Sequence, residues 1–369
     1  MRTNTESSVW TPPHCPNPKC SYHSHLTGPW PFSRRGHYTR KSDRARIPRA
    51  QCRTCGVTFS SQSFSADYWL KRRDLLPRIF MRAVGGMCNR QIARDLRCSP
   101  ETVHRLLARL GRHCLLLHMQ IWGQRPPNGP LVVDGFESFE YSQYYPMHHH
   151  LAVEAETGFW IYHTDSELRR KGRMTPRQKI RRAELEKKHG RPDPQSIRKD
   201  MAELLRVSLA NVGSATVRSD DHRSYPAAVR SVHCRVRHEV TSSRRPRTSR
   251  NPLFEINLLD LLIRHSQANH RRETIAWSKR RQASAERLAI LQVWRNYVKR
   301  RWEKGPIETP AMLKGLLPAP LTVAEVFARR MFPGPLELPP RWRDYYRRAV
   351  TTRAPVSYTH LRAHETSSM

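Results

Sequence analysis

Hydrophobic and polar positions follow two different periods along this chain. Between residues 66 and 117 the apolar residues recur at the three- and four-residue spacing of helices. From residue 131 onward they form the short runs and alternations typical of strands. The change of period predicts a helical unit followed by an α/β unit.

The α/β unit shows the order strand, hairpin, helix, strand, helix, strand. Residues 131–136 form a buried strand, and residues 148–162 form two alternating runs that meet at Thr157-Gly158, which predicts a hairpin. A charged stretch near residues 165–210 is expected to be a helical insertion. This order of elements is that of an RNase H-like fold. We therefore predict an RNase H-like catalytic domain over residues 128–304.

The helical unit, residues 63–122, contains the pattern of a helix-turn-helix. Residues 89–96 form a short helix, and Ser99 and Pro100 suit the N-cap and first position of the next one. In this motif the second helix lies in the major groove of DNA. An ordinary helical hairpin is the alternative. The outward-facing candidates for DNA contact are Thr102, His104, Arg105 and Arg109.

The composition of the chain indicates the kind of partner it binds. The 369 residues include 66 Lys and Arg against 31 Asp and Glu, a net charge of +35. Such an excess indicates a polyanion such as double-stranded DNA, since Lys and Arg that neutralise phosphates release counterions. A membrane-surface binder is the alternative. No apolar run approaches the length of a membrane span, and the first residues lack the apolar core of a signal peptide, so we expect a cytoplasmic protein with no membrane partner.

Four of the eight cysteines are grouped in pairs. Cys15 and Cys20 flank a Pro-containing turn, and Cys52 and Cys55 flank a second turn that ends at Gly56. Two such turns supply four thiolates to one tetrahedral Zn²⁺, which leaves no open position for catalysis. We predict a zinc ribbon over residues 10–62 in which the zinc is structural.

Two aspartates each end an apolar strand. Asp134 follows Leu131-Val132-Val133, and Asp220 ends the run that begins at Ser214. Neighbouring parallel strands would present both carboxylates at one sheet edge, where a third acid from a later helix would complete an oxygen site for two Mg²⁺. An aspartate after a strand is also common as a turn residue. The two aspartates together are therefore stronger evidence for a metal site than either one alone.

With these motifs in place, the chain resembles DDE/D transposases of bacterial insertion sequences that have an N-terminal zinc ribbon and helix-turn-helix. The matching stretches span roughly residues 10–302 and lie at 52–59, 132–135, 219–225 and 270–279. The resemblance implies cleavage and strand transfer at transposon ends with two Mg²⁺ or Mn²⁺ ions, by a homo-oligomer bound to DNA in the bacterial nucleoid. It also implies a Tyr five positions after the second acid, which fits Tyr225 and selects Asp220 over Asp221.

The third acid has three candidates. On a helical wheel Asn257, Asp260 and Arg264 share one face, whereas Glu255 points elsewhere. Asp260 lies among leucines, where an ionised carboxylate is costly unless it is paired or binds metal. This favours Asp260, and an ion pair with Arg264 is the alternative explanation. Glu255 remains an alternate because the family's usual third acid is Glu, and Asn257 is a second alternate.

The last part of the chain divides into a basic helical stretch and a tail. Between residues 264 and 304 we expect helices whose basic faces contact DNA phosphates, or simply a solvated charged face. We interpret residues 305–369 as a peripheral tail, of which 356–369 resemble translated adapter sequence rather than native protein. The candidate phosphate contacts are Arg271, Arg272, Lys279 and Arg280.

Two other functions remain open at this point. A non-catalytic DNA-binding regulator, or a decayed transposase, would bind DNA without cutting it. A ribonuclease or resolvase would prefer RNA–DNA hybrids or branched junctions. The run His148-His149-His150 does not add a metal site, because adjacent strand residues face opposite ways, and we expect these histidines to be partly exposed.

Overall fold

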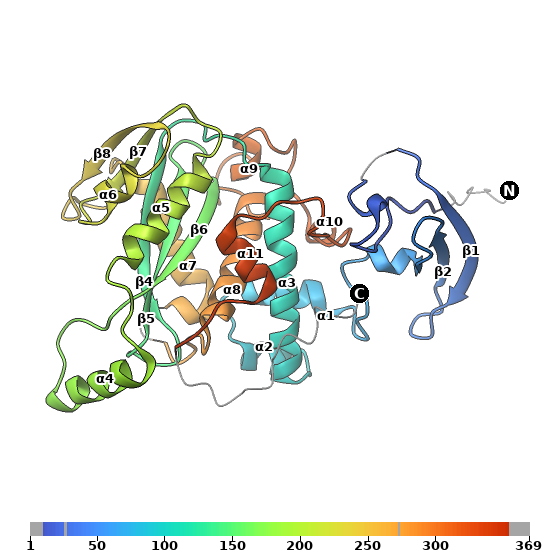
Figure 1. Cartoon of the computed structure of the whole chain (residues 1–369), viewed down its shortest axis with the longest axis horizontal. Coiled ribbons are helices and arrows are strands. Elements are labelled where there is room, and N and C mark those ends of the chain that lie inside the picture. The colour runs from blue at the N-terminus through green and yellow to red at the C-terminus, as the bar shows by residue number, and fades with distance from the viewer. Residues whose placement is uncertain (1–9, 26–27, 272–273, 354–369) are drawn as a thin grey trace.

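The computed structural model describes residues 10–25, 28–271 and 274–353. It is a mixed α/β structure with two separate sheets (Figure 1). Figure 1 shows a small N-terminal sheet at one end, a five-stranded mixed sheet at the other, and the helices α3, α8 and α11 between them.

The N-terminal sheet is antiparallel and has the strand order β1-β2-β3. Its small core consists of Cys15, Cys20, Cys52, Trp30, Ala50 and Phe59, with the rings of Trp30 and Phe59 stacked at 6.1 Å. The elements are η1 (Ser21–His23), β1 (Phe32–Thr39), β2 (Arg46–Cys52), β3 (Thr58–Ser60) and η2 (Ser61–Phe64).

Three helices follow: α1 (Leu75–Val84), α2 (Asn89–Asp95) and α3 (Pro100–Trp122). The Ser99 hydroxyl accepts a hydrogen bond from the Thr102 amide, so Ser99 caps α3 as the sequence indicates. The first helix begins at Leu75 rather than near Ala66, because residues 66–74 form turns in which Trp69 has a positive φ of 62°.

Helix α3 also belongs to the centre of the molecule. A Cβ atom at Gly111 would lie 2.7 Å from Cβ of Glu286 on α8, so only glycine permits the close crossing of these two helices. One continuous hydrophobic core therefore joins the helical unit to the α/β unit.

The five-stranded sheet has the order β6-β5-β4-β7-β8. β4, β5 and β6 are antiparallel neighbours, whereas β7 pairs with β4 and β8 in parallel. The predicted hairpin is thus present, and so is the parallel pairing of the two strands that carry Asp134 and Asp220. The strands are β4 (Leu131–Phe139), β5 (Pro146–Glu154), β6 (Trp160–Glu167), β7 (Ser214–Asp220) and β8 (Arg235–Thr241).

Helices cover both faces of this sheet. α5 (Ser196–Ser208) lies on one face, where the Thr164 and Ser166 hydroxyls of β6 donate to the backbone and side chain of Asp200. α7 (Phe254–Ser266) lies on the other face, where the Arg264 guanidinium is 5.2 Å from the centre of the Phe136 ring. The remaining helices here are α4 (Pro176–His189), α6 (Tyr225–Val229), η3 (Ala268–His270), α8 (Arg281–Val293) and the π-helix η4 (Trp294–Val298).

The predicted insertion near 165–210 is smaller than the sequence suggests. Within it, α5 buries Met201, Leu204 and Leu205 against the sheet and is part of the core. Only the stretch between β6 and α5 stands apart, since no residue of α4 is buried.

The prediction of a peripheral tail is wrong for residues 305–353. Its helices are α9 (Pro310–Leu313), α10 (Val323–Val326) and α11 (Pro340–Arg347). Trp342 and Tyr345 of α11 are fully buried, and the Trp342 indole donates to the carbonyl of His163. A Pro-rich sequence with short apolar pieces hides this role, because the partners lie far away along the chain. Residues 356–369 lie outside the described residues.

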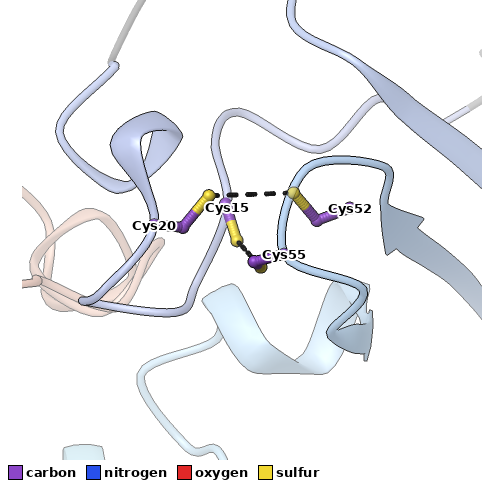
Figure 2. A group of neighbouring side chains, drawn as sticks. All are labelled: Cys15, Cys20, Cys52 and Cys55. Atoms are coloured by element: carbon purple, nitrogen blue, oxygen red, sulfur yellow. Dashed lines mark hydrogen bonds between the residues drawn. The ribbon is translucent and has the colours of Figure 1, made fainter.

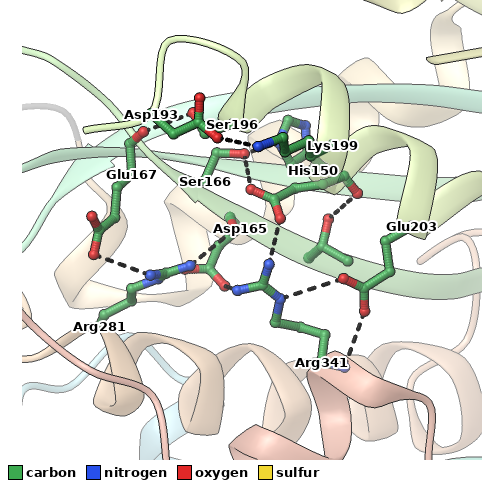
Figure 3. A network of polar contacts seen from close by, with 12 residues as sticks. His150, Asp165, Ser166, Glu167, Asp193, Ser196, Lys199, Glu203, Arg281 and Arg341 are labelled. Carbon is green, nitrogen blue, oxygen red and sulfur yellow. Dashed lines mark hydrogen bonds and ion pairs between the residues drawn. The ribbon is translucent and has the colours of Figure 1, made fainter.

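A buried charge network ties α8 and α11 to the edge strand β6 (Figure 3). Arg281 and Arg341 both interact with Asp165, and Arg341 also pairs with Asp200. Although burial opposes ionisation of Asp165, the two guanidinium charges hold its pKa below the ordinary value. Removal of one partner would leave an uncompensated buried charge, which is costly.

Buried histidines predict a loss of stability in mild acid. His118 is inaccessible, its Nε2 lies 2.9 Å from the Ile161 carbonyl, and burial lowers its pKa to about 3. The unfolded chain takes up this proton near pH 6.5, so the free energy of unfolding should fall by ~1.4 kcal/mol for each pH unit below that. Burial similarly lowers the pKa of His148, His149 and His163, so each of these histidines adds to the slope.

Chemical unfolding at a series of pH values measures this slope. His118→Gln should flatten it by about one proton between pH 6.5 and 5. An unchanged slope in the variant would show that His118 is not buried in its neutral form.

Candidate functional site

Two groups of side chains could hold metal ions, and they lie in different sheets. The first is the cysteine group of the N-terminal sheet (Figure 2). Cys15 and Cys20 precede β1, Cys52 ends β2, and Cys55 lies in the turn between β2 and β3. Their four Sγ atoms all lie within 4.8 Å of one another, as the sequence predicts.

The sulfur spacing fits tetrahedral zinc. The Sγ atoms of Cys15 and Cys55 are 3.6 Å apart, and those of Cys20 and Cys52 are 3.8 Å apart. Zn–S bonds of ~2.3 Å at tetrahedral angles place sulfurs ~3.8 Å apart. Four clustered thiols are thus consistent with a structural zinc. Within residues 10–25, 28–271 and 274–353 no other group of three or more His, Cys, Asp or Glu has all its ligand atoms within 4.8 Å of one another.

The second group is built from β4, β7 and α7. In the parallel pairing of β4 with β7, Val132 lies beside Arg218. Asp134 and Asp220 each follow two residues later, so they lie on the same face and at the same level of neighbouring strands. The charge of Asp220 acts on Asp134 and raises its pKa, which agrees with this placement.

Helix α7 carries Asp260 and packs on the face of β4 that bears Asp134 and Phe136. At its start, Glu255 pairs with Arg301 at 2.6 Å and lies close to Gly158, at the end of the hairpin far from Asp134. Near its end, Arg264 contacts Phe136. Asp260 lies between these points and its charge also raises the pKa of Asp134.

The three candidates for the third acid therefore differ in their surroundings. Asp260 is half-buried and forms an ion pair with Arg264 at 3.1 Å, so the alternative contact foreseen from the sequence is present as well. Glu255 is buried and held by Arg301, away from Asp134 and Asp220. Asn257 is half-buried one turn before Asp260 on α7.

Electrostatics single out Asp134. Burial and then the charge of Asp220 raise its pKa to about 7, and the hydroxyl of the buried Tyr225 lies 3.5 Å from its Oδ1. Burial also raises the pKa of Asp220. Arg247 lowers both pKa values but does not return that of Asp134 to its ordinary range. Burial and the neighbouring carboxylate thus both oppose ionisation of Asp134.

This donor set fits hard divalent cations. Carboxylate oxygens are the ligands of Mg²⁺ and Mn²⁺, and a bound cation would relieve the repulsion within the group. The ligand atoms of the three acids do not all lie within 4.8 Å of one another. Ligands on two ions ~3.8 Å apart, each ~2.1 Å from its ion, span up to ~8 Å, so a two-ion site does not require a tighter group.

The residues predicted to contact DNA differ in their exposure to solvent. Arg105 is exposed on α3, whereas Thr102 and His104 are half-buried. Arg109 is a correction: it is half-buried and donates to the carbonyl of Ala66, so it holds the turn before α1 instead of facing solvent. Of the later candidates, Arg271 and Lys279 are exposed, Arg280 is half-buried, and Arg272 lies outside the described residues.

Two groups of basic residues were missed from the sequence. Arg90, Arg94 and Arg97 are exposed and line a shallow surface pocket with Ser99 and Pro100 at the α2–α3 turn. The four-residue spacing of Arg90 and Arg94 on one helix face was the available signal. The second group is the arginine-rich loop of residues 242–250, which follows β8.

The side chains of His148, His149 and His150 in β5 point to alternate faces of the sheet as predicted, but their exposure differs from the prediction. His148 and His150 lie on one face with ring centres 4.6 Å apart, while His149 faces Phe136 on the other. All three are buried, not partly exposed, because β5 lies between β4 and β6 and helices cover both faces.

None of the described helices is both long enough and apolar enough to cross a lipid bilayer.

Known proteins say little about the function of this site. No family model matches the sequence, and no curated protein matches it. Among solved structures, one chain of the cryo-EM structure of the simian T-cell lymphotropic virus intasome in complex with PP2A regulatory subunit B56 gamma is similar at 15% identity, with a TM-score of 0.26. The similarity covers 53% of this chain and 59% of that chain, less than two thirds of its length. A TM-score this low decides neither fold nor function.

Proposed function

We propose that this protein is a DDE/D-type DNA transposase that cuts and joins DNA strands at a two-metal site formed by Asp134, Asp220 and Asp260. The observation that carries the proposal is the parallel pairing of β4 with β7, in which Val132 lies beside Arg218, two residues before Asp134 and Asp220 respectively. The order β6-β5-β4-β7-β8, with helices on both faces, supports an RNase H-like domain.

The chemistry follows from the donor set. Two divalent ions at such a site supply Lewis acidity and orient an in-line displacement at phosphorus. Tyr225 orients the carboxylate of Asp134 through its hydroxyl. In cleavage, water oxygen bonds to phosphorus as the bond to O3′ breaks. In strand transfer, the freed 3′-hydroxyl bonds to a target phosphorus and displaces another O3′.

The other parts are assigned supporting roles. The four cysteines hold a structural zinc that stabilises the N-terminal sheet. Helices α2 and α3 form a helix-turn-helix, and the exposed Arg105 together with Arg90, Arg94 and Arg97 contacts DNA. The net charge of +35 agrees with a large DNA footprint.

Nicking of supercoiled plasmid tests the activity. The purified protein should convert it to open circles with Mg²⁺ or Mn²⁺ and not without added divalent ions. DNA binding with no cleavage under either metal would identify a non-catalytic regulator instead. Faster cutting of RNA–DNA hybrids or branched junctions than of duplex would identify a ribonuclease or resolvase.

The third acid is tested by a pair of variants. Asp260→Asn should lower the nicking rate by about 100-fold, because Asp260 is the proposed third ligand of the metal ions. Glu255→Gln should leave the rate per folded molecule within about threefold of the parent, although it destabilises the protein by uncoupling Arg301. Single-turnover rates normalised to folded protein measure both. The reverse pattern would make Glu255 the ligand and Asp260 a structural partner of Arg264.

A further inference from the structure

The loop of residues 242–250, here called the arginine loop, leaves the sheet at the carboxylate group. In the pairing of β7 with β8, Asp220 lies opposite Thr241, and the loop begins at the next residue. The loop then leads to α7, which carries Asp260. The arginine loop therefore connects the sheet edge at Asp220 to the helix that carries Asp260.

The arginine loop is exposed but held in place at both ends. All nine of its residues are exposed. The amide of Ser243 donates to Oδ2 of Asp221 at 3.3 Å, directly after Asp220. At the other end the buried Asn251 donates from its side chain to the carbonyl of Pro246 at 2.8 Å. These bonds fix the loop beside the acids.

The arginine loop carries four exposed positive charges. They belong to Arg244, Arg245, Arg247 and Arg250, and none of them forms an ion pair in the part of the chain that the structure describes. Many other arginines are paired, such as Arg218 of β7 with Glu239. Four exposed guanidinium groups next to three carboxylates suit a ligand that is itself an extended polyanion, since guanidinium forms paired hydrogen bonds with phosphate.

We propose that the arginine loop binds the phosphates of the DNA strand that enters the carboxylate site, with Arg247 next to the bond to be cut. Arg247 is assigned this position because it adjoins Pro246, whose carbonyl the buried Asn251 holds between β8 and α7. The positive charges of the loop offset the repulsion between the phosphates of the DNA strand and the carboxylates. Contacts to phosphates position the strand without reading its sequence. That this strand is the one cut rests on the proposed function.

Salt dependence of binding tests the loop without reference to cleavage. The probe is a fluorescent duplex of about 30 bp, or three helical turns, without added divalent ions. The loop variant carries Arg→Ala at 244, 245, 247 and 250. A control variant carries Ala in place of Arg177, Lys179, Lys187 and Lys188, which are exposed on α4 and make the same change in net charge.

The loop variant should bind at least about tenfold more weakly, and its plot of log affinity against log salt should be shallower by about 0.9 for each phosphate that the loop no longer neutralises. The control variant should keep the parent's slope. Equal losses of affinity in both variants, or no loss in the loop variant, would overturn the proposal. A loop variant that binds an RNA duplex more weakly but DNA as well as the parent would overturn it too.

A single substitution then tests the position of Arg247. At saturating plasmid, Arg247→Ala should nick at least about tenfold more slowly than the parent, and Arg247→Lys should recover part of the rate. Arg177→Ala should nick like the parent. If the parent does not nick at all, the proposed function fails while the binding result still decides the loop. If the parent nicks and Arg247→Ala matches it, the placement of Arg247 is wrong.

Discussion

Replacing Asp134 by Asn is expected to abolish metal-dependent strand cleavage, with a loss of at least about 1,000-fold, or ~4 kcal/mol of transition-state stabilisation. Burial, and then the charges of Asp220 and Asp260, raise the pKa of Asp134, so a cation bound there would stabilise its ionised form. The amide keeps the shape of the side chain but not its charge. Plasmid nicking with Mg²⁺ or Mn²⁺ measures the rate.

The matched control for this variant is Glu137→Gln. Glu137 lies on the same strand, three residues further on, and is exposed on the opposite face of the sheet. It should nick at the parent rate. Asp134→Asn should also keep the parent's affinity for duplex DNA, because phosphate contacts come from basic residues elsewhere. Nicking by Asp134→Asn at the parent rate would remove the site from this account.

Loss of the zinc ligands is expected to unfold the N-terminal sheet. Its core consists of three small or aromatic side chains and three of the cysteines themselves, too little to hold a sheet without metal. Structural zinc contributes about 10–16 kcal/mol of apparent binding energy in small zinc domains. Cys52→Ser should therefore lose one zinc per chain and the hydrogen-exchange protection of β1 and β2.

The control for the cysteine variant is Cys98→Ser, a half-buried cysteine outside the cluster. It should retain one zinc and normal protection. The effect of Cys52→Ser should extend to the C-terminal region, because Phe332 packs against His14 and Phe64 and the Arg330 amide donates to the Phe64 carbonyl. Full retention of zinc in Cys52→Ser, or its absence from the parent, would contradict the assignment.

Local patterns predicted the parts of the site that depend on local geometry. The four cysteines were found because ligand spacing within a turn is a property of a few neighbouring residues. The parallel pairing of the strands that carry Asp134 and Asp220 was predicted because a strand that ends in a carboxylate is visible in sequence. The helical wheel predicted that Asp260 and Glu255 point in different directions, since directions on α7 follow from 100° per residue.

Features that depend on distant partners were not predictable in this way. Burial of His148–His150 requires the knowledge that β5 is an inner strand, and burial of Trp342 requires its contact with His163. Arg109 looks like a recognition-helix residue until its bond to Ala66 is seen. In the sequence, the arginine loop has the composition of a solvated linker. Only the pairing of Asp220 with Thr241 in the structure shows that it begins at the candidate site.

The most direct test of the central claim is an experimental structure of the protein with Mn²⁺, in which anomalous scattering locates the ions. The account predicts two peaks about 3.5–4 Å apart, bounded by the carboxylates of Asp134, Asp220 and Asp260. Side chains of Asp134 and Asp220 separated by more than about 10 Å, or Mn²⁺ bound only elsewhere, would contradict it.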